Sequence, residues 1–134
     1  MKIKKEIVGA VVAEASAKMS DPNYSAVLVG GFVQSQRDAA QYLSAHATDF
    51  GGAEAVVNAI FHCALIGLCF QRGYGRTVRR LTFDDLDAAS AGDRRAALAA
   101  RQPYVLEYID ANVDRAAMKD SLILIALAME SASR

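Results

Sequence analysis

The chain has 134 residues, of which 53% are hydrophobic and 22% are charged, with 15 basic and 15 acidic side chains. This length and composition are typical of one globular domain and exclude a disordered chain, which combines low hydrophobicity with high net charge. A formal net charge of zero provides no overall field to attract nucleic acid or an anionic membrane, so such binding would require a local patch. We expect residues 1–134 to form a single domain.

The first predicted element is an amphipathic helix at the N-terminus. Apolar residues recur every four positions from Ile3 to Met19, which is the spacing of one face of a helix. The lysines before this run, followed by apolar residues, resemble the start of a signal peptide, but Glu6 and Glu14 interrupt both flanks. We therefore expect a cytoplasmic protein rather than a secreted one.

A second helix is predicted over about residues 22–47. Asp21 suits the N-cap, and Pro22 suits the first helical position, where no amide donor is needed. The pair Gly30 and Gly31 falls inside this helix. Glycine weakens a helix, and it permits a bend or the close approach of another backbone.

The central prediction is a buried helix over about residues 53–71. Between Ala55 and Phe70 there is no charged side chain, and the only clearly polar residues are Asn58 and His62. A helix that is apolar on nearly every face must be buried in protein or in lipid. The apolar run is shorter than the roughly 20 residues needed to span a bilayer and contains two polar side chains, so we expect burial in protein and no membrane partner.

The second half of the chain is also predicted to be helical. After a loop over residues 73–81, Thr82 and Asp85 have the spacing of a capping box. Further helices follow, with a kink or junction expected near Pro103 and a strongly apolar final helix over about residues 114–131. Together these elements predict an all-α bundle of five or six helices around the central one.

A possible internal repeat appears when the sequence is shifted by 66 residues. The shift places Gln36 on Gln102, and it suggests two helical hairpins, at about 22–72 and 93–132, packed about a pseudo-twofold axis. The alternative is coincidence, because any two amphipathic helices share such matches. The sequence leaves this choice open.

The same shift places Tyr42 on Tyr108. With the two glutamines, these tyrosines could line a ligand-binding or partner-binding cleft at the pseudo-twofold axis. The plainer interpretation, which we favour, is that the four side chains make hydrogen bonds between helices at the edge of the core.

Residues typical of metal sites and active sites are sparse. His62, Cys63 and Cys69 lie on one predicted helix, but no second cluster supplies the further ligands that zinc requires. We interpret the cysteines as buried free thiols and His62 as a core residue, with Asn58 one turn away as its expected hydrogen-bond partner. No catalytic motif is present, so we assign no catalytic residue, metal or cofactor.

The only local charge excess surrounds one tyrosine and comprises Arg72, Tyr74, Arg76, Arg79 and Arg80. Such a group could bind phosphate, RNA or an acidic partner through bidentate contacts. The alternative, which we favour, is that these arginines pair with the acidic residues just downstream, Asp84, Asp85 and Asp87.

These observations predict a small cytoplasmic protein-interaction or regulatory module whose partner is another protein or a second copy of itself. A homodimer is compatible with so much apolar sequence in a short chain. The abundance of Ala, and of Arg over Lys, suggests a bacterial origin by association. The alternative is a nucleic-acid- or phosphate-binding protein that uses the Arg72–Arg80 loop, and an enzyme ranks third.

Overall fold

The computed structural model describes all residues 1–134 and contains only α-helices. In chain order the helices are α1 (Lys5–Lys18), α2 (Pro22–Ser35), α3 (Arg37–Ala45), α4 (Ala47–Phe50), α5 (Ala53–Tyr74), α6 (Phe83–Ala89), α7 (Arg94–Arg101), α8 (Pro103–Asn112) and α9 (Ala116–Ser133). The all-α fold class agrees with the sequence-based prediction. The number of helices does not, because there are nine rather than five or six.

The additional helices arise where predicted continuous helices are interrupted. Gln36 leaves the helical conformation with φ −129° and ψ 59°, and Gln102 does so with φ −140° and ψ 70°. The second break precedes Pro103, whose ring disfavours helical geometry at the residue before it. The first break has no proline or glycine beside it, so local sequence gives no sign that α2 and α3 are separate helices.

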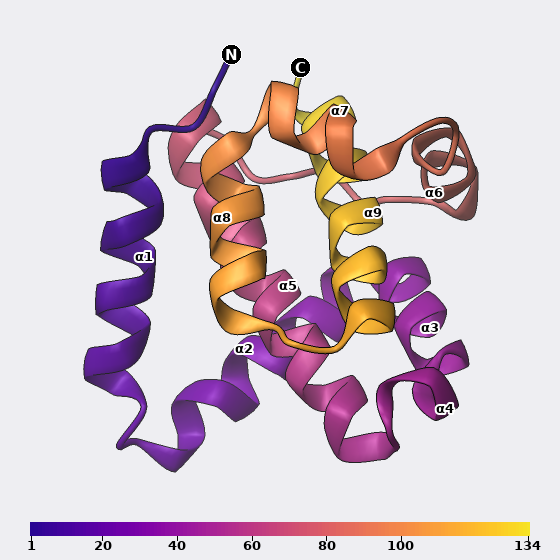
Figure 1. The fold of residues 1–134 in the computed structure, drawn as a ribbon. Coiled ribbons are helices and arrows are strands. Elements are labelled where there is room, and N and C mark those ends of the chain that lie inside the picture. The colour runs from indigo at the N-terminus through magenta and orange to yellow at the C-terminus, as the bar shows by residue number, and fades with distance from the viewer.

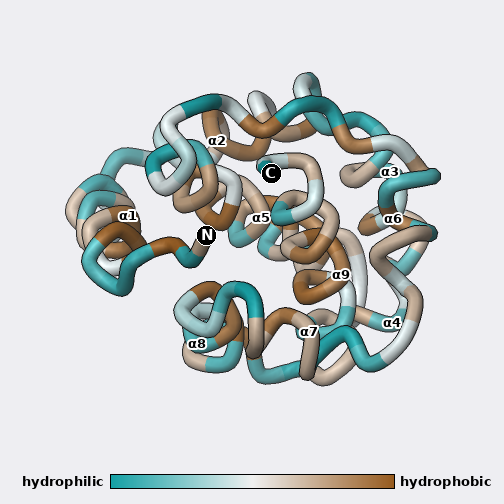
Figure 2. Tube along the Cα trace, turned by 90° about the horizontal axis from the view of Figure 1, so that it is seen from above, coloured by the Kyte–Doolittle hydropathy of each residue, from teal (hydrophilic) through white to brown (hydrophobic).

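Helices α5 and α9 pack against each other at the centre of the molecule. Seen from above, they lie in the middle with the other helices around them (Figure 2). Every residue of α9 from Ser121 to Glu130 is buried. In α5, by contrast, Val57 is 52% exposed and Asn58 is also exposed. The expectation that the central helix is buried on all sides therefore describes α9 better than α5.

The peripheral helices pack around the central pair. Helix α1 contacts α5 and α8, whereas α6 contacts α9 and α3. Helix α2 packs on α5, and α7 packs on α9. Both chain ends lie at the same end of the molecule, at the top of Figure 1.

One helix, α5, is long and apolar enough to cross a membrane by length and composition. Half of its most apolar stretch is nevertheless buried inside this protein. The core helix of a soluble protein has the same two properties, so α5 is compatible with a packed core.

Candidate functional site

Helix α2 has an uncharged surface that the protein itself does not cover. No charged residue occurs between Pro22 and Gln36, and only Phe32 of the helix is buried. Val27 is 70% exposed and Val33 is 41% exposed. A surface helix of a globular protein normally carries charged or polar residues opposite its buried face, so the outer face of α2 is unusual for a solvated surface.

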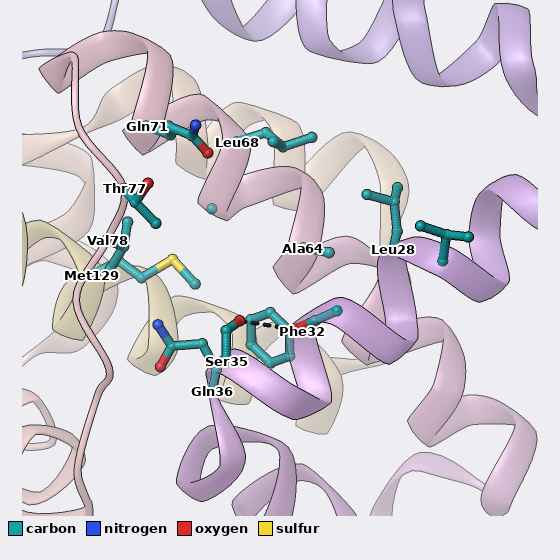
Figure 3. Close-up of a pocket in the computed structure, with 13 residues that line it drawn as sticks. Leu28, Phe32, Ser35, Gln36, Ala64, Leu68, Gln71, Thr77, Val78 and Met129 are labelled. Atoms are coloured by element: carbon teal, nitrogen blue, oxygen red, sulfur yellow. Dashed lines mark hydrogen bonds between the residues drawn. The ribbon is translucent and has the colours of Figure 1, made fainter.

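A groove runs along the side of α2 that faces α5, and we call it the α2–α5 groove. Its cavity measures about 190 Å³, and no charged residue lines it. Figure 3 shows α2 on one side, α5 on the other and the segment after α5 closing one end, with Met129 of α9 reaching between them. The apolar lining consists mainly of Leu28, Phe32, Ala64, Leu68, Val78 and Met129.

The polar groups of the groove are either already paired or lie on its exposed rim. The Ser35 hydroxyl donates to the carbonyl of Gly31 over 2.9 Å. Gln71 and Thr77 are exposed. The cavity is smaller than the roughly 300–1,000 Å³ of typical small-molecule sites. With no titratable group in its lining, it suits an apolar side chain of a partner better than a reaction.

Gln36, one of the predicted site residues, forms part of this groove through a backbone contact. Its side-chain Oε1 accepts from the Leu81 amide over 2.8 Å, and its Nε2 donates to the Arg79 carbonyl over 3.0 Å. The side-chain amide of Gln36 thus pairs with the carbonyl of one residue and the N–H group of the second residue after it, which is the pattern of pairing between neighbouring β-strands. This pairing holds the segment that closes the groove.

Gln102 makes the same type of contact elsewhere in the molecule. Its Oε1 accepts from the Ile3 amide over 2.8 Å, and its Nε2 donates to the Met1 carbonyl over 2.9 Å. Both glutamines are buried. Each glutamine binds the backbone of an extended segment at positions i and i+2. The expected hydrogen bond to another helix is present only for Gln102, whose Nε2 also donates to the Tyr74 hydroxyl of α5 over 3.2 Å.

The two predicted tyrosines have different surroundings from each other. Tyr108 is buried, and its hydroxyl lies 2.7 Å from Nδ1 of His62. Tyr42 is half-buried and packs on His46, with 4.4 Å between ring centroids. Because Asn58 is exposed, the predicted His62–Asn58 hydrogen bond is wrong, and Tyr108 provides the contact. Burial lowers the pKa of His62 and raises the pKa of Tyr108, so both groups stay neutral near pH 7.

The predicted arginines all contact acceptors within the chain. The pairs are Arg72 with Glu14, Arg76 with the carbonyl of Ser133, Arg79 with Asp85 and Arg80 with Asp38. Only Asp85 of the three acids expected downstream is used, and Arg79 binds it through two bonds of 2.8 and 2.9 Å. Tyr74 donates to the Met1 carbonyl over 3.1 Å. The side chains are therefore directed to acceptors on several different elements rather than to one common site.

The two cysteines are free and buried in the core. Burial raises the pKa of Cys69 to about 12 and raises the pKa of Cys63 as well. Thiols with such pKa values are protonated and unreactive at neutral pH. No three potential metal-ligating side chains lie together.

Sequence reasoning did not single out Val27, Leu28 or Leu68 as site residues, because apolar residues in predicted helices are expected to be buried. The signal was the absence of charge along the whole of α2 together with two interior glycines. A Cβ added at Gly30 or Gly31 would meet nothing within 4 Å. The fold itself therefore gives no packing reason for either glycine.

Comparisons with models of known protein families, with curated proteins and with solved structures found no match to this chain. A functional assignment must therefore come from the geometry and chemistry of the molecule itself. The α2–α5 groove and the outer face of α2 are uncharged surfaces that no other part of the chain covers.

Proposed function

We propose that the protein is a small cytoplasmic interaction module, and that α2 and the α2–α5 groove bind an apolar surface of a protein partner. One observation carries this proposal: α2 has no charged residue from Pro22 to Gln36, yet only Phe32 of the helix is buried. Its outer face has the composition of an interface core, from which charged residues are depleted.

The energetics favour coverage of this surface. Complete burial of a Val or Leu side chain contributes about 1.5–3 kcal/mol relative to exposure. Val27 and Val33, 70% and 41% exposed, leave enough apolar surface for a partner to gain about 2–3 kcal/mol before association entropy is subtracted. The groove beside them has room for one further apolar side chain from that partner.

The two alternative functions have less support from the geometry. Nucleic-acid binding by the arginine loop would require Arg72, Arg76, Arg79 and Arg80 to leave their present acceptors. Catalysis would require a nucleophile or a titratable group at the groove, and none lines it. A location in the cytoplasm accords with two buried, unpaired thiols.

We also propose that the chain consists of two halves built on one plan, as the shift of 66 residues suggests. In support, Gln36 and Gln102 lie at equivalent helix breaks and make equivalent hydrogen bonds. The contacts cross between halves, because Gln36 of the first half holds residues 79–81, and Gln102 of the second half holds residues 1–3. The packing of α1 on α5 and α8 corresponds to that of α6 on α9 and α3.

Site-specific photo-crosslinking in living cells of the native host tests the interaction proposal. A photoreactive residue at Val27 should give a discrete adduct with a protein, whereas one at Ala99, exposed on α7, should not. Val27 and Thr77 both line the groove. Val27→Asp should therefore abolish crosslinks from a photoreactive residue at Thr77, because burial of an unpaired charge is strongly unfavourable. The absence of adducts from both Val27 and Thr77 would overturn the proposal.

A further inference from the structure

We infer that the partner of α2 is a second copy of this chain, packed with the two α2 helices antiparallel across a twofold axis near residues 28 and 29. This inference rests on the proposed function and adds the identity of the occupant. Among the exposed residues of α2, four recur at intervals of four, three and four positions, namely Asn23, Val27, Gly30 and Gln34. This spacing forms one seam along a helix, as in paired helices.

The centre of this seam has complementary shapes. Val27 projects into solvent with 70% of its surface exposed. Gly30 has no side chain, and a Cβ there would meet nothing within 4 Å in its own chain. Glycine inside a helix is destabilising by about 1 kcal/mol relative to Ala, so an external contact would explain it. In an antiparallel pair, residue 27 of one helix can face residue 30 of the other, so that the residue numbers of every facing pair sum to 57. Each Val27 then lies over Gly30 of the other copy.

The same register places Asn23 opposite Gln34 of the other copy. Both side chains are exposed amides, which donate and accept hydrogen bonds and can therefore pair with each other. The seam is thus apolar at its centre and polar at its two ends, which is the arrangement of an interface core and its rim.

Charge complementarity also favours an antiparallel second copy. The uncharged stretch is bordered by Asp21 on one side and Arg37 on the other, and both lack an ion-pair partner in the chain. An antiparallel pair brings Asp21 of each copy toward Arg37 of the other, at both ends of the contact. A parallel pair would place like charges together, and a partner of one net charge would satisfy only one end.

The expected dimer is reversible. Helix α2 has 14 residues and is about 21 Å long at 1.5 Å per residue. A contact centred on two such helices falls in the smallest class of specific interfaces, below about 1,200 Å². Dimerisation should therefore depend on concentration and require sedimentation-velocity measurements up to several hundred micromolar.

Exchange of the protruding and recessed positions tests the register. Val27→Ala removes the projection, and Gly30→Val fills the recess, so each variant alone should dimerise at least roughly tenfold more weakly. An equimolar mixture of the two should form a heterodimer, because one copy then supplies both projections and the other both recesses. Gly9→Val, at an exposed α1 glycine whose added Cβ also meets nothing, is the matched control and should dimerise as wild type does.

A charge test at Gln34 examines the antiparallel arrangement separately. Gln34→Glu places a carboxylate near Asp21 of the other copy and should weaken the dimer, whereas Gln34→Lys should preserve or strengthen it. Circular dichroism and thermal melting of each variant verify that the monomer folds. This pair keeps the inference testable if Gly30→Val does not fold.

The outcomes separate this inference from the proposed function. A wild-type protein that stays monomeric at all concentrations, or a dimer indifferent to both Gly30→Val and Gln34→Glu, overturns the homodimer. If Val27 then crosslinks to a different protein, the interaction surface stands and the identity of its partner was wrong. If Val27 and Thr77 crosslink to nothing, both proposals fail.

Discussion

Gln36 and Gln102 lie at helix breaks of similar backbone geometry but in different surroundings. Each uses its buried amide to hold an extended segment at two backbone positions, Arg79 and Leu81 for the first and Met1 and Ile3 for the second. The local backbone geometry is nearly the same, with φ and ψ differing by about ten degrees. The side chains around each break are what distinguish the two regions.

The hollow beside the Gln102 break is charged, and three of its charged side chains, Arg101, Glu130 and Arg134, pair with one another. Buried Glu130 accepts two hydrogen bonds from Arg134, over 2.7 and 2.8 Å, and lies 3.7 Å from Arg101. The hollow beside the Gln36 break is the α2–α5 groove, which has no charged residue. Two breaks of similar geometry therefore lie beside different surfaces. One is a hollow that contains ion pairs, and the other is a groove without charged residues. The proposed interaction surface therefore depends on the side chains around the break rather than on its backbone geometry.

The largest expected effect comes from removing either glutamine amide. Both Gln36→Leu and Gln102→Leu keep most of the side-chain volume. Gln36→Leu leaves the Leu81 amide and the Arg79 carbonyl without partners, whereas Gln102→Leu leaves only the Ile3 amide without one, because Tyr74 still donates to the Met1 carbonyl. Each unsatisfied group costs about 1–3 kcal/mol, so Gln36→Leu should lose about 2–6 kcal/mol of unfolding free energy and Gln102→Leu about 1–3 kcal/mol. Urea denaturation measures this loss. If only one of the two variants is destabilised, the two breaks are not equivalent.

A comparably large loss of stability is expected from truncating the pair formed by His62 of α5 and Tyr108 of α8. His62→Ala removes a half-buried ring and leaves the Tyr108 hydroxyl unpaired, which should destabilise the protein by about 2 kcal/mol. Tyr108→Phe, which retains the ring, should cost about 1 kcal/mol. Metal analysis of wild type and His62→Ala provides the control, because stoichiometric zinc lost in the variant would contradict a structural role.

A smaller effect, confined to acidic pH, is expected at the Gln102 break. The Arg134 guanidinium beside Glu130 holds the pKa of its carboxyl below the ordinary value of 4.5, despite the opposing effect of burial. A lowered pKa in the folded protein means that Glu130 stabilises it above about pH 4.5 and loses this contribution as the pH falls through the folded-state value. Glu130→Gln should therefore flatten the decline of melting temperature below that pH. An unchanged decline would show that the pair contributes nothing.

Sequence reasoning could predict those features that have a local chemical signature. Periodicity predicted helices, the Thr82–Asp85 spacing predicted a capping box that the structure contains, and Pro103 marked a junction. The break at Gln36 had no such mark, because neither proline nor glycine lies beside it and its side chain contacts a segment more than forty residues away. The His62 partner was missed for the same reason, since Tyr108 is distant in sequence.

The candidate site could be predicted only in part. Gln36 was singled out as a polar position of a possible repeat, but its role in closing a groove depends on residues 79–81, which sequence spacing cannot place. The exposure of Val27 is also a tertiary property, since an apolar residue in a helix predicts burial unless the neighbouring helices are known. The charge-free length of α2 was visible throughout and is the signal that could have been used.

The smallest effect on stability is expected in the segment that Gln36 holds, and it tests whether that segment binds nucleic acid. Arg79 and Arg80 are both more than half exposed and paired with Asp85 and Asp38. Exposed ion pairs contribute little, so Arg79→Gln/Arg80→Gln should melt close to wild type. If the four arginines of this region instead bound phosphates, affinity for single-stranded RNA would fall with salt at a logarithmic slope of about −3, reduced by about 1.4 in this variant. We expect no measurable binding near physiological salt, because each arginine already has an acceptor in the chain. A salt-dependent isotherm that the double variant abolishes would move the functional surface from the α2–α5 groove to its arginine-bearing edge.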